Sequence, residues 1–178
     1  MTVHIREMIV DDIPAVFHLG ERLFTAEEVQ NLHRTWDEYE VLTLFSTERE
    51  HCLVAEDEEE TVVGFALGTT IEKRKSSWTY GYLLWLGVDP ENQREGLAQR
   101  LFRQFKQRMA AAGARILMVD TQASNEEALE FFRKQGFDSQ EKHVFLSLNI
   151  DDERRDLEDR EAHRVGRQVG GRPRNGKR

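Results

Sequence analysis

Apolar and polar residues follow two different periods along the chain, and these periods predict its elements. Alternation at every second residue, with many β-branched and aromatic side chains, predicts strands over residues 3–9, 51–55, 62–72, 79–88, 116–121 and 144–148. A period of about 3.6 residues predicts helices over residues 11–24, 25–45, 97–113 and 124–136. The strands between residues 51 and 88 are separated by short charged turns, which favours antiparallel hairpins.

The predicted helix ends carry the residues that helix ends favour. Asp11 and Asp12 are suited to cap the first helix, and Ser124 with Glu127 forms a capping-box pattern before the last one. Gly113 stands where a glycine commonly ends a helix, and Gly136 does so for the last helix. These signals place the loops between the elements.

The strand, helix and strand over residues 83–121 predict the fold class. Two parallel strands joined through a helix need a crossover connection, whereas the hairpins before them are antiparallel. We therefore expect an α/β protein (α+β in some schemes) with a mixed sheet and helices on both of its faces.

The chain has 178 residues, enough for one domain with a substantial core, which we expect to span residues 1–150. Over residues 151–167 nearly every side chain is charged or polar, and glycines and a proline at 170–173 interrupt any helix. The charged C-terminal tail, residues 151–178, is therefore predicted to be a frayed helix followed by disorder. A contact of this tail with a nucleic acid or a ribosome is the alternative.

Charge is unevenly divided between these two parts. The whole chain has a net charge of −8, but residues 151–178 hold nine basic against seven acidic side chains, which leaves 16 against 26 for residues 1–150. An acidic body disfavours broad nucleic-acid binding and favours a cationic substrate such as an amine.

Several classes of protein are disfavoured by what the sequence lacks. No stretch approaches the roughly 18 apolar residues of a membrane span, and Asp11 and Asp12 stand where a signal peptide would be apolar, so we expect a cytoplasmic protein without membrane contact. Cys52 is the only cysteine, and the six histidines lack metal-ligand spacing. We therefore expect neither a disulfide nor a metal site.

The most specific chemical signal lies between the strand at 79–88 and the helix at 97–113. Val88-Asp89-Pro90 ends the strand, and Gln93-Arg94-Glu95-Gly96-Leu97-Ala98 leads into the helix. Backbone N–H groups at such a helix start can bind a pyrophosphate, and Gly96 would let the backbone come close to it. On these residues alone, an ordinary strand-to-helix loop explains the turn equally well.

Two further motifs follow in register: Asn125-Glu126-Glu127-Ala128 and Gly136-Phe137. With them, the chain resembles the GNAT superfamily of acetyltransferases over about residues 3–148, and looks nearest to its ribosomal-protein alanine N-acetyltransferase branch. The resemblance implies a single GNAT-like domain with six to seven strands. It also implies direct transfer of acetyl from acetyl-CoA to a primary amine, either a small amine or a polypeptide N-terminus.

The resemblance also implies how acetyl-CoA binds. Two strands would separate near Leu86 and Met118 to admit the cofactor, and a β-bulge there would aim an N–H group at the thioester carbonyl. The implied cofactor-binding residues are Leu86, Gly87 and Val88 along the pantetheine arm, Gln93, Arg94, Glu95, Gly96, Leu97, Ala98 and Gln99 at the pyrophosphate, Asn125 near the pantetheine or thiol end, and Phe132 in the wall. Asn125 is also explained as an ordinary polar residue of a first helical turn.

For catalysis, the resemblance places Asp120 where N-terminal acetyltransferases have a general-base glutamate. An alkylammonium with a pKa of about 10 must lose its proton before it attacks, and Asp120 could take that proton directly or through water. A turn residue bonded to nearby N–H groups is the alternative for Asp120. Phe132 stands where the family usually has a tyrosine that protonates the thiolate, so Tyr82 or Tyr80 is a possible acid, although cross-strand packing also explains both.

Two other functions stay open at this point. Because Phe132 cannot donate a proton, the chain is alternatively a non-catalytic acyl-CoA-binding sensor. A dinucleotide site at the Gly96 turn is disfavoured, because the Gly-x-Gly-x-x-Gly fingerprint is missing there. The sequence predicts neither the acceptor nor the oligomeric state.

Overall fold

A five-stranded mixed sheet is the centre of the computed structural model, which describes residues 2–24, 36–72, 78–142 and 144. The strands are β1 (His4–Glu7), β2 (Cys52–Glu56), β3 (Val62–Glu72), β4 (Thr79–Val88) and β5 (Ala114–Val119), in this order across the sheet. Neighbouring strands from β1 to β4 are antiparallel, whereas β4 and β5 are parallel. The predicted α/β class and mixed sheet are confirmed.

The number of strands and some of their bounds differ from the prediction. Five strands are described instead of six to seven, and the predicted strand at 144–148 falls on residues that are not described, apart from Val144. β5 begins at Ala114, two residues before the predicted start, because its ladder with β4 already begins at the pair Thr79 and Ala114.

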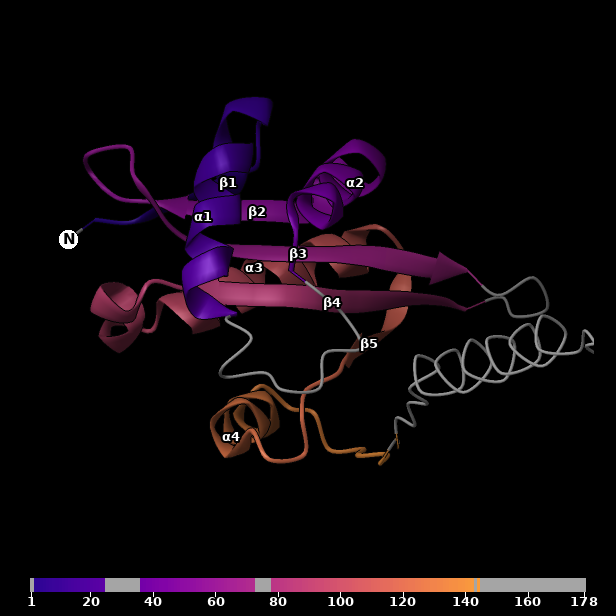
Figure 1. Ribbon diagram of the computed structural model, residues 1–178. Coiled ribbons are helices and arrows are strands. Elements are labelled where there is room, and N and C mark those ends of the chain that lie inside the picture. Colours follow the sequence, from indigo (N-terminus) through magenta and orange to yellow (C-terminus); the bar gives the residue numbers. More distant parts are fainter. Residues whose placement is uncertain (1, 25–35, 73–77, 143, 145–178) are drawn as a thin grey trace, which may run out of the picture. The chain divides into compact units, whose positions relative to one another are not determined.

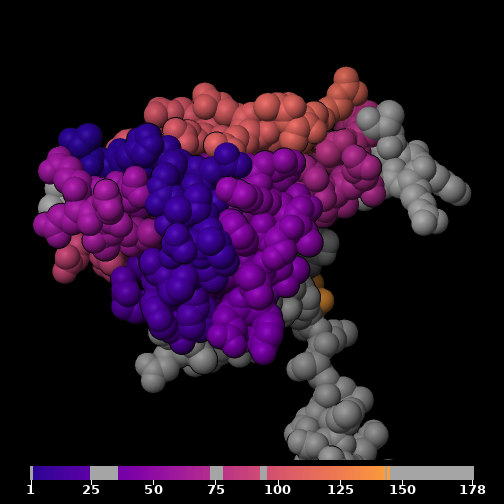
Figure 2. Space-filling model, turned by 90° about the horizontal axis from the view of Figure 1, so that it is seen from above, coloured from indigo at the N-terminus to yellow at the C-terminus, as the bar shows by residue number. Residues whose placement is uncertain are grey.

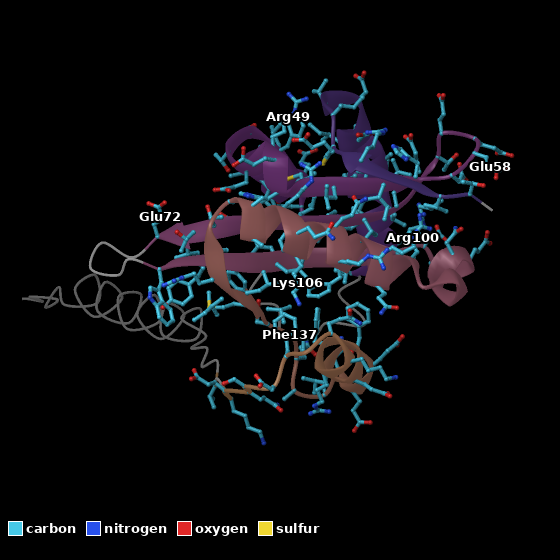
Figure 3. All side chains as sticks on the ribbon, turned by 180° about the vertical axis from the view of Figure 1, so that it is seen from behind. Arg49, Glu58, Glu72, Arg100, Lys106 and Phe137 are labelled. Carbon is cyan, nitrogen blue, oxygen red and sulfur yellow. The ribbon has the colours of Figure 1, made fainter. Side chains whose placement is uncertain are left out.

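Helices cover both faces of this sheet, as predicted (Figure 1). The helical elements are η1 (Val10–Asp12), α1 (Ile13–Leu23), α2 (Glu38–Glu48), η2 (Arg49–His51), η3 (Pro90–Glu95), α3 (Leu97–Ala111) and α4 (Glu126–Lys134). α1 and α2 lie side by side on one face (Figures 1 and 2), and α3 crosses the other face, where Arg100 and Lys106 mark it in Figure 3.

Of the predicted helix over 25–45, residues 38–45 are confirmed as helical, whereas the two described residues before them are not. Trp36 and Asp37 precede the helix, which runs from Glu38 to Glu48. Asp37 has an extended backbone, and its carboxylate accepts a hydrogen bond from the N–H of Glu40 at 2.8 Å, so it caps α2. Residues 25–35 are not described.

The core on the α1 and α2 face is built around aromatic rings. Phe24, Trp36, Phe65 and Trp85 have ring centroids 4.9 to 6.2 Å apart. The indole N–H of Trp36 donates to the carbonyl of Phe17 at 3.0 Å, so the polar part of this buried ring is satisfied. A Cβ at Gly20 would come within 2.1 Å of Trp36, so α1 can pack this closely only with glycine there.

A charged network fixes the start of α1 to the sheet. The guanidinium of Arg6 holds both carboxylate oxygens of Asp12, at 2.6 and 2.9 Å, and donates to Glu56 at 2.8 Å. Asp12 also accepts from the N–H of Ile9 at 2.8 Å. Burial alone would raise the pKa of Asp12, but the bonds from Arg6 and Ile9 outweigh it and hold that pKa below its ordinary value.

On the opposite face, α4 is attached to α3 through phenylalanine rings. Phe102 of α3 lies 6.2 Å from Phe132 and 5.8 Å from Phe137, measured between ring centroids. α4 ends as the glycine signal predicts: Gly136 has a φ of 98°, and the N–H of Phe137 donates to the carbonyl of Phe132 at 3.1 Å. The rings of Phe132 and Phe137 complete this motif at 5.4 Å.

Residues Met1–Gln140 form one compact unit, and Glu141–Arg178 form a second. Of the second unit only Glu141, Lys142 and Val144 are described, so the expected boundary at residue 150 and the charged tail stay predictions. In the described ranges, no helix combines the length and the apolar character that crossing a membrane requires.

Candidate active site

The ladder between β4 and β5 ends halfway along β4. Its last pairs are Tyr82 with Met118 and Leu83 with Val119. β4 continues to Val88, with pairing to β3 along its other edge. Leu86, Gly87 and Val88 therefore run past the end of the β5 ladder, as the resemblance implied, whereas Met118 still lies inside it.

A β-bulge lies just at the point where the strands separate. Leu67 of β3 pairs with Trp85 and its neighbour Gly68 pairs with Leu83, so Leu84 is an extra residue in β4. The bulge was expected at Leu86 to Val88 and lies two residues earlier. Because of it, Leu84 and Trp85 both belong to the core on the α1 and α2 face, while Leu83 belongs to the α3 face.

The turn after β4 places a left-handed glycine at the start of α3. Gly96 has φ 67° and ψ 23°, and no atom lies within 4 Å of the position that a Cβ would take there. The N–H of Arg100 donates to the carbonyl of Gly96 at 3.1 Å, and the N–H groups of the residues before it have no partner inside the helix. For Gln93 to Glu95 only the backbone is described, so the predicted contact of the Arg94 side chain stays a prediction.

Asp89 holds this turn in place, a role that was not predicted. One carboxylate oxygen accepts from the N–H of Glu91 at 3.1 Å, and the other pairs with Arg22 of α1 at 2.9 Å. Its own N–H donates to Val63 of β3 at 2.9 Å. An aspartate directly before a proline at a helix start was the available signal.

The two residues named as catalytic candidates are in direct contact. The phenol of Tyr82 donates to the carboxylate of Asp120 at 2.6 Å. Tyr82 is half-buried and belongs to the last part of the ladder. Asp120 is exposed and directly follows β5. In this arrangement the phenolic proton is directed at Asp120, at the place where β4 and β5 separate.

Asn125, not Ser124, caps α4. The side-chain oxygen of Asn125 accepts from the N–H of Ala128 at 3.0 Å, which is the bond that a cap makes to the third residue of a helix. The prediction of a Ser124 cap is therefore wrong by one residue. The amide NH₂ of Asn125 points away from this bond, at the exposed start of α4.

On the α1 and α2 face, Trp85 makes a contact that was not predicted. Its indole N–H donates to the carboxylate of Glu40 in the first turn of α2, at 3.1 Å. Trp85 is 8% exposed and packs in the aromatic core, whereas Glu40 is half-buried. The two residues are 45 positions apart, so no local pattern indicates that they meet.

Cys52 is buried and does not offer a nucleophile. Burial, and then the nearby charges of Glu48 and Glu7, raise the pKa of its thiol to about 12. The thiol therefore stays protonated near neutral pH.

The model of the acetyltransferase (GNAT) family matches residues 13–137. The chain belongs to this family. No curated protein sequence matches it significantly. The match confirms the GNAT part of the resemblance and leaves the ribosomal-protein alanine branch as a prediction.

Solved structures of GNAT proteins share the fold at low sequence identity. An aminoglycoside acetyltransferase from an uncultured soil metagenomic sample has a TM-score of 0.65 and 23% identity, over 83% of this chain and 97% of that one. The aminoglycoside acetyltransferase AAC(6′)-Iy, bound to a CoA bisubstrate analogue, gives 0.67 and 17%, over 84% and 99%. The NatC complex, bound to Gag peptide and CoA, gives 0.68 and 16%, over 79% and 87%.

Proposed function

We propose that this GNAT protein transfers the acetyl group of acetyl-CoA to a primary amine by direct attack. The hydrogen bond between Tyr82 and Asp120, at the point where β4 and β5 separate, carries the proposal. This bond places a carboxylate, which can accept a proton, next to the strand edge at which we propose that the cofactor binds. Family membership and the CoA-bound relatives support the choice of cofactor.

The residues around this point fit acetyl-CoA. The open space at Gly96 lets phosphates approach the N–H groups at the start of α3, where the helix dipole favours negative charge. We assign the backbone of Leu86 to Val88 to the pantetheine arm, the N–H groups of Gln93 to Gln99 to the pyrophosphate, and the NH₂ of Asn125 to the thiol end. Bound acetyl-CoA supplies an acetyl group that is activated as a thioester.

Asp120 is the proposed general base. An ammonium acceptor with a pKa of about 10 is almost fully protonated at neutral pH, so a carboxylate that removes its proton raises the concentration of the attacking amine. Because Asp120 is exposed, a water molecule can carry the proton. The phenol of Tyr82 donates to the carboxylate and fixes its orientation. We therefore assign Tyr82 primarily as a positioning residue and only secondarily as an acid.

The leaving group needs less help than the nucleophile. Phe132 packs on Phe102 and Phe137 and supplies no proton. A thiol has a pKa of about 8.5, so its thiolate is a tolerable leaving group near neutral pH. The protonated thiol of buried Cys52 also supports direct attack instead of a covalent acetyl-cysteine.

Release of the CoA thiol with a panel of acceptors tests the proposal. The panel contains small amines, aminoglycosides and peptides with free N-termini, including an alanine-initiated peptide for the ribosomal-protein branch. A thiol reagent can follow the release, because the single cysteine of the chain is buried and protonated. We expect acceptor-dependent release and an acetylated product in the mass spectrum.

Calorimetric titration with acetyl-CoA separates this proposal from its alternative. Binding together with acceptor-dependent thiol release supports the enzyme. Binding without release for any acceptor supports the acyl-CoA sensor, which the phenylalanine at position 132 motivates. Absence of binding contradicts both.

A further inference from the structure

Glu40 differs from three other buried or half-buried carboxylates, each of which pairs with an arginine. Asp12 and Glu56 are hydrogen-bonded to Arg6, and Asp89 pairs with Arg22. The carboxylate of Glu40 is held instead by the neutral indole N–H of Trp85, and within the described part of the chain it has no cationic partner. A half-buried negative charge that is fixed in position but not neutralised is costly unless a cation comes to it.

Glu40 lies on the same face of the sheet as the Tyr82 and Asp120 pair. A Cβ at Gly81 would meet Met109 of α3, so residue 81 faces α3, and its neighbour Tyr82 points to the opposite face, where α1 and α2 lie (Figure 2). Trp85, which holds Glu40, belongs to the core of that face. Tyr82 and Trp85 are three positions apart on β4, which corresponds to about 10 Å in a regular strand. The bulge at Leu84 shortens this distance.

The surroundings of Glu40 strengthen a charge pair there. Trp85 packs against Phe24 with ring centroids 4.9 Å apart and is nearly buried, so one side of the carboxylate is covered by apolar rings. Attraction between opposite charges grows as water is excluded from around them. A cation at Glu40 would therefore bind more tightly than one at a fully exposed glutamate.

We propose that Glu40 binds a second cationic group of the acceptor, so that the substrates are diamines or polyamines. One nitrogen is acetylated at Asp120, and another stays charged and pairs with Glu40 several ångströms away. The inference rests on the proposed acetyltransferase function and adds the class of acceptor to it. A peptide with a free N-terminus and lysine as its second residue presents the same pair of charges.

The test compares acceptors with and without the second charge. Pentane-1,5-diamine is paired with pentylamine, and a Ser-Lys peptide is paired with a Ser-norleucine peptide. We expect kcat/KM for pentane-1,5-diamine to exceed that for pentylamine by about tenfold, the size of one charge-assisted hydrogen bond. A preference that appears only within the peptide pair would overturn the assignment to diamines and polyamines.

Two variants of the same helical turn assign the preference to Glu40. Glu40→Gln keeps an oxygen for the indole of Trp85 and removes the charge. Glu38→Gln removes the same charge from an exposed neighbour. The preference should fall about tenfold in Glu40→Gln, through a lower kcat/KM for pentane-1,5-diamine, and should persist in Glu38→Gln. Equal preferences in all three proteins, or equal losses in both variants, would overturn the inference.

Calorimetric titration of the CoA-saturated protein with pentane-1,5-diamine gives a reading that does not depend on turnover. We expect binding that weakens about tenfold in Glu40→Gln and that also weakens as salt is added, because salt screens the pair. Diamine binding that Glu40→Gln leaves unchanged contradicts the inference. Turnover of pentylamine and pentane-1,5-diamine at equal rates also contradicts it, while it leaves the proposed acetyltransferase function intact.

Discussion

The two sides of the candidate site are built in different ways. At the Gly96 turn, the groups proposed to bind the cofactor belong to the backbone: one left-handed glycine and the capping carboxylate of Asp89 place N–H groups at the start of α3. On the α1 and α2 face, side chains from distant parts of the chain meet, as Trp85 does with Glu40. The cofactor can therefore be inferred from a short local motif, whereas the acceptor depends on tertiary contacts.

The largest expected effect concerns the attachment of α4 on the cofactor side. Phe102→Ala removes a ring that contacts Phe131, Phe132 and Phe137, and should lower the free energy of unfolding by about 4 kcal/mol. Urea denaturation measures this loss. Leu42→Ala on the exposed side of α2 is the control and should change stability by less than about 0.5 kcal/mol. A loss below about 1 kcal/mol for Phe102→Ala would show that α4 is held in another way.

The second effect concerns the charged network under α1. Because the pKa of Asp12 is held below its ordinary value, its stabilisation is fully present at neutral pH and is lost as the pH falls through the folded-state pKa. Asp12→Asn should lower the free energy of unfolding by about 2 kcal/mol at neutral pH. The difference from the wild type should shrink as the pH falls below about 4.

Urea titrations of both proteins across this pH range check the sign. Asp11→Asn changes an exposed neighbour and should show no such pH dependence. A difference between wild type and Asp12→Asn that grows toward low pH would contradict the assigned direction.

The smallest effect separates the binding role of Gly96 from its conformation. Gly96 and Gly113 lie at the two ends of α3, both with positive φ and with no atom near a Cβ position. Alanine at either position should cost about 1 kcal/mol of stability. Only Gly96→Ala should weaken acetyl-CoA binding, by about tenfold, because its methyl group enters the space proposed for the pyrophosphate. Equal affinities of the two variants for acetyl-CoA would contradict the proposal that the pyrophosphate binds at this turn.

The same contrast explains how much the sequence could predict. β3 and β4 have the predicted bounds, because alternation and charged turns determine a strand locally. Capping is also determined locally, yet both Ser124 and Asn125 are suitable caps for α4. The hydrogen bond from the N–H of Ala128 to the side chain of Asn125 identifies Asn125 as the cap. The position of the bulge could not be predicted, since it depends on the register between β3 and β4.

Contacts between distant residues account for the rest. Tyr82 and Asp120 were each named as candidates, but their hydrogen bond follows from the parallel ladder that places Tyr82 beside Met118. Glu40 carries no signal in the sequence, because its role depends on the indole of Trp85 in another element. Side-chain contacts on the α1 and α2 face are therefore known only once the chain has folded.

The pH profile of Asp120→Asn tests the central claim most directly. At neutral pH, kcat/KM of the variant should fall about 10²- to 10³-fold below the wild type, because the base is lost. The gap should narrow as the pH approaches about 10, where the amine loses its proton without help. Asp11→Asn is the matched control and should follow the wild type. A ratio of wild type to Asp120→Asn that stays constant across this range would contradict a general base at Asp120.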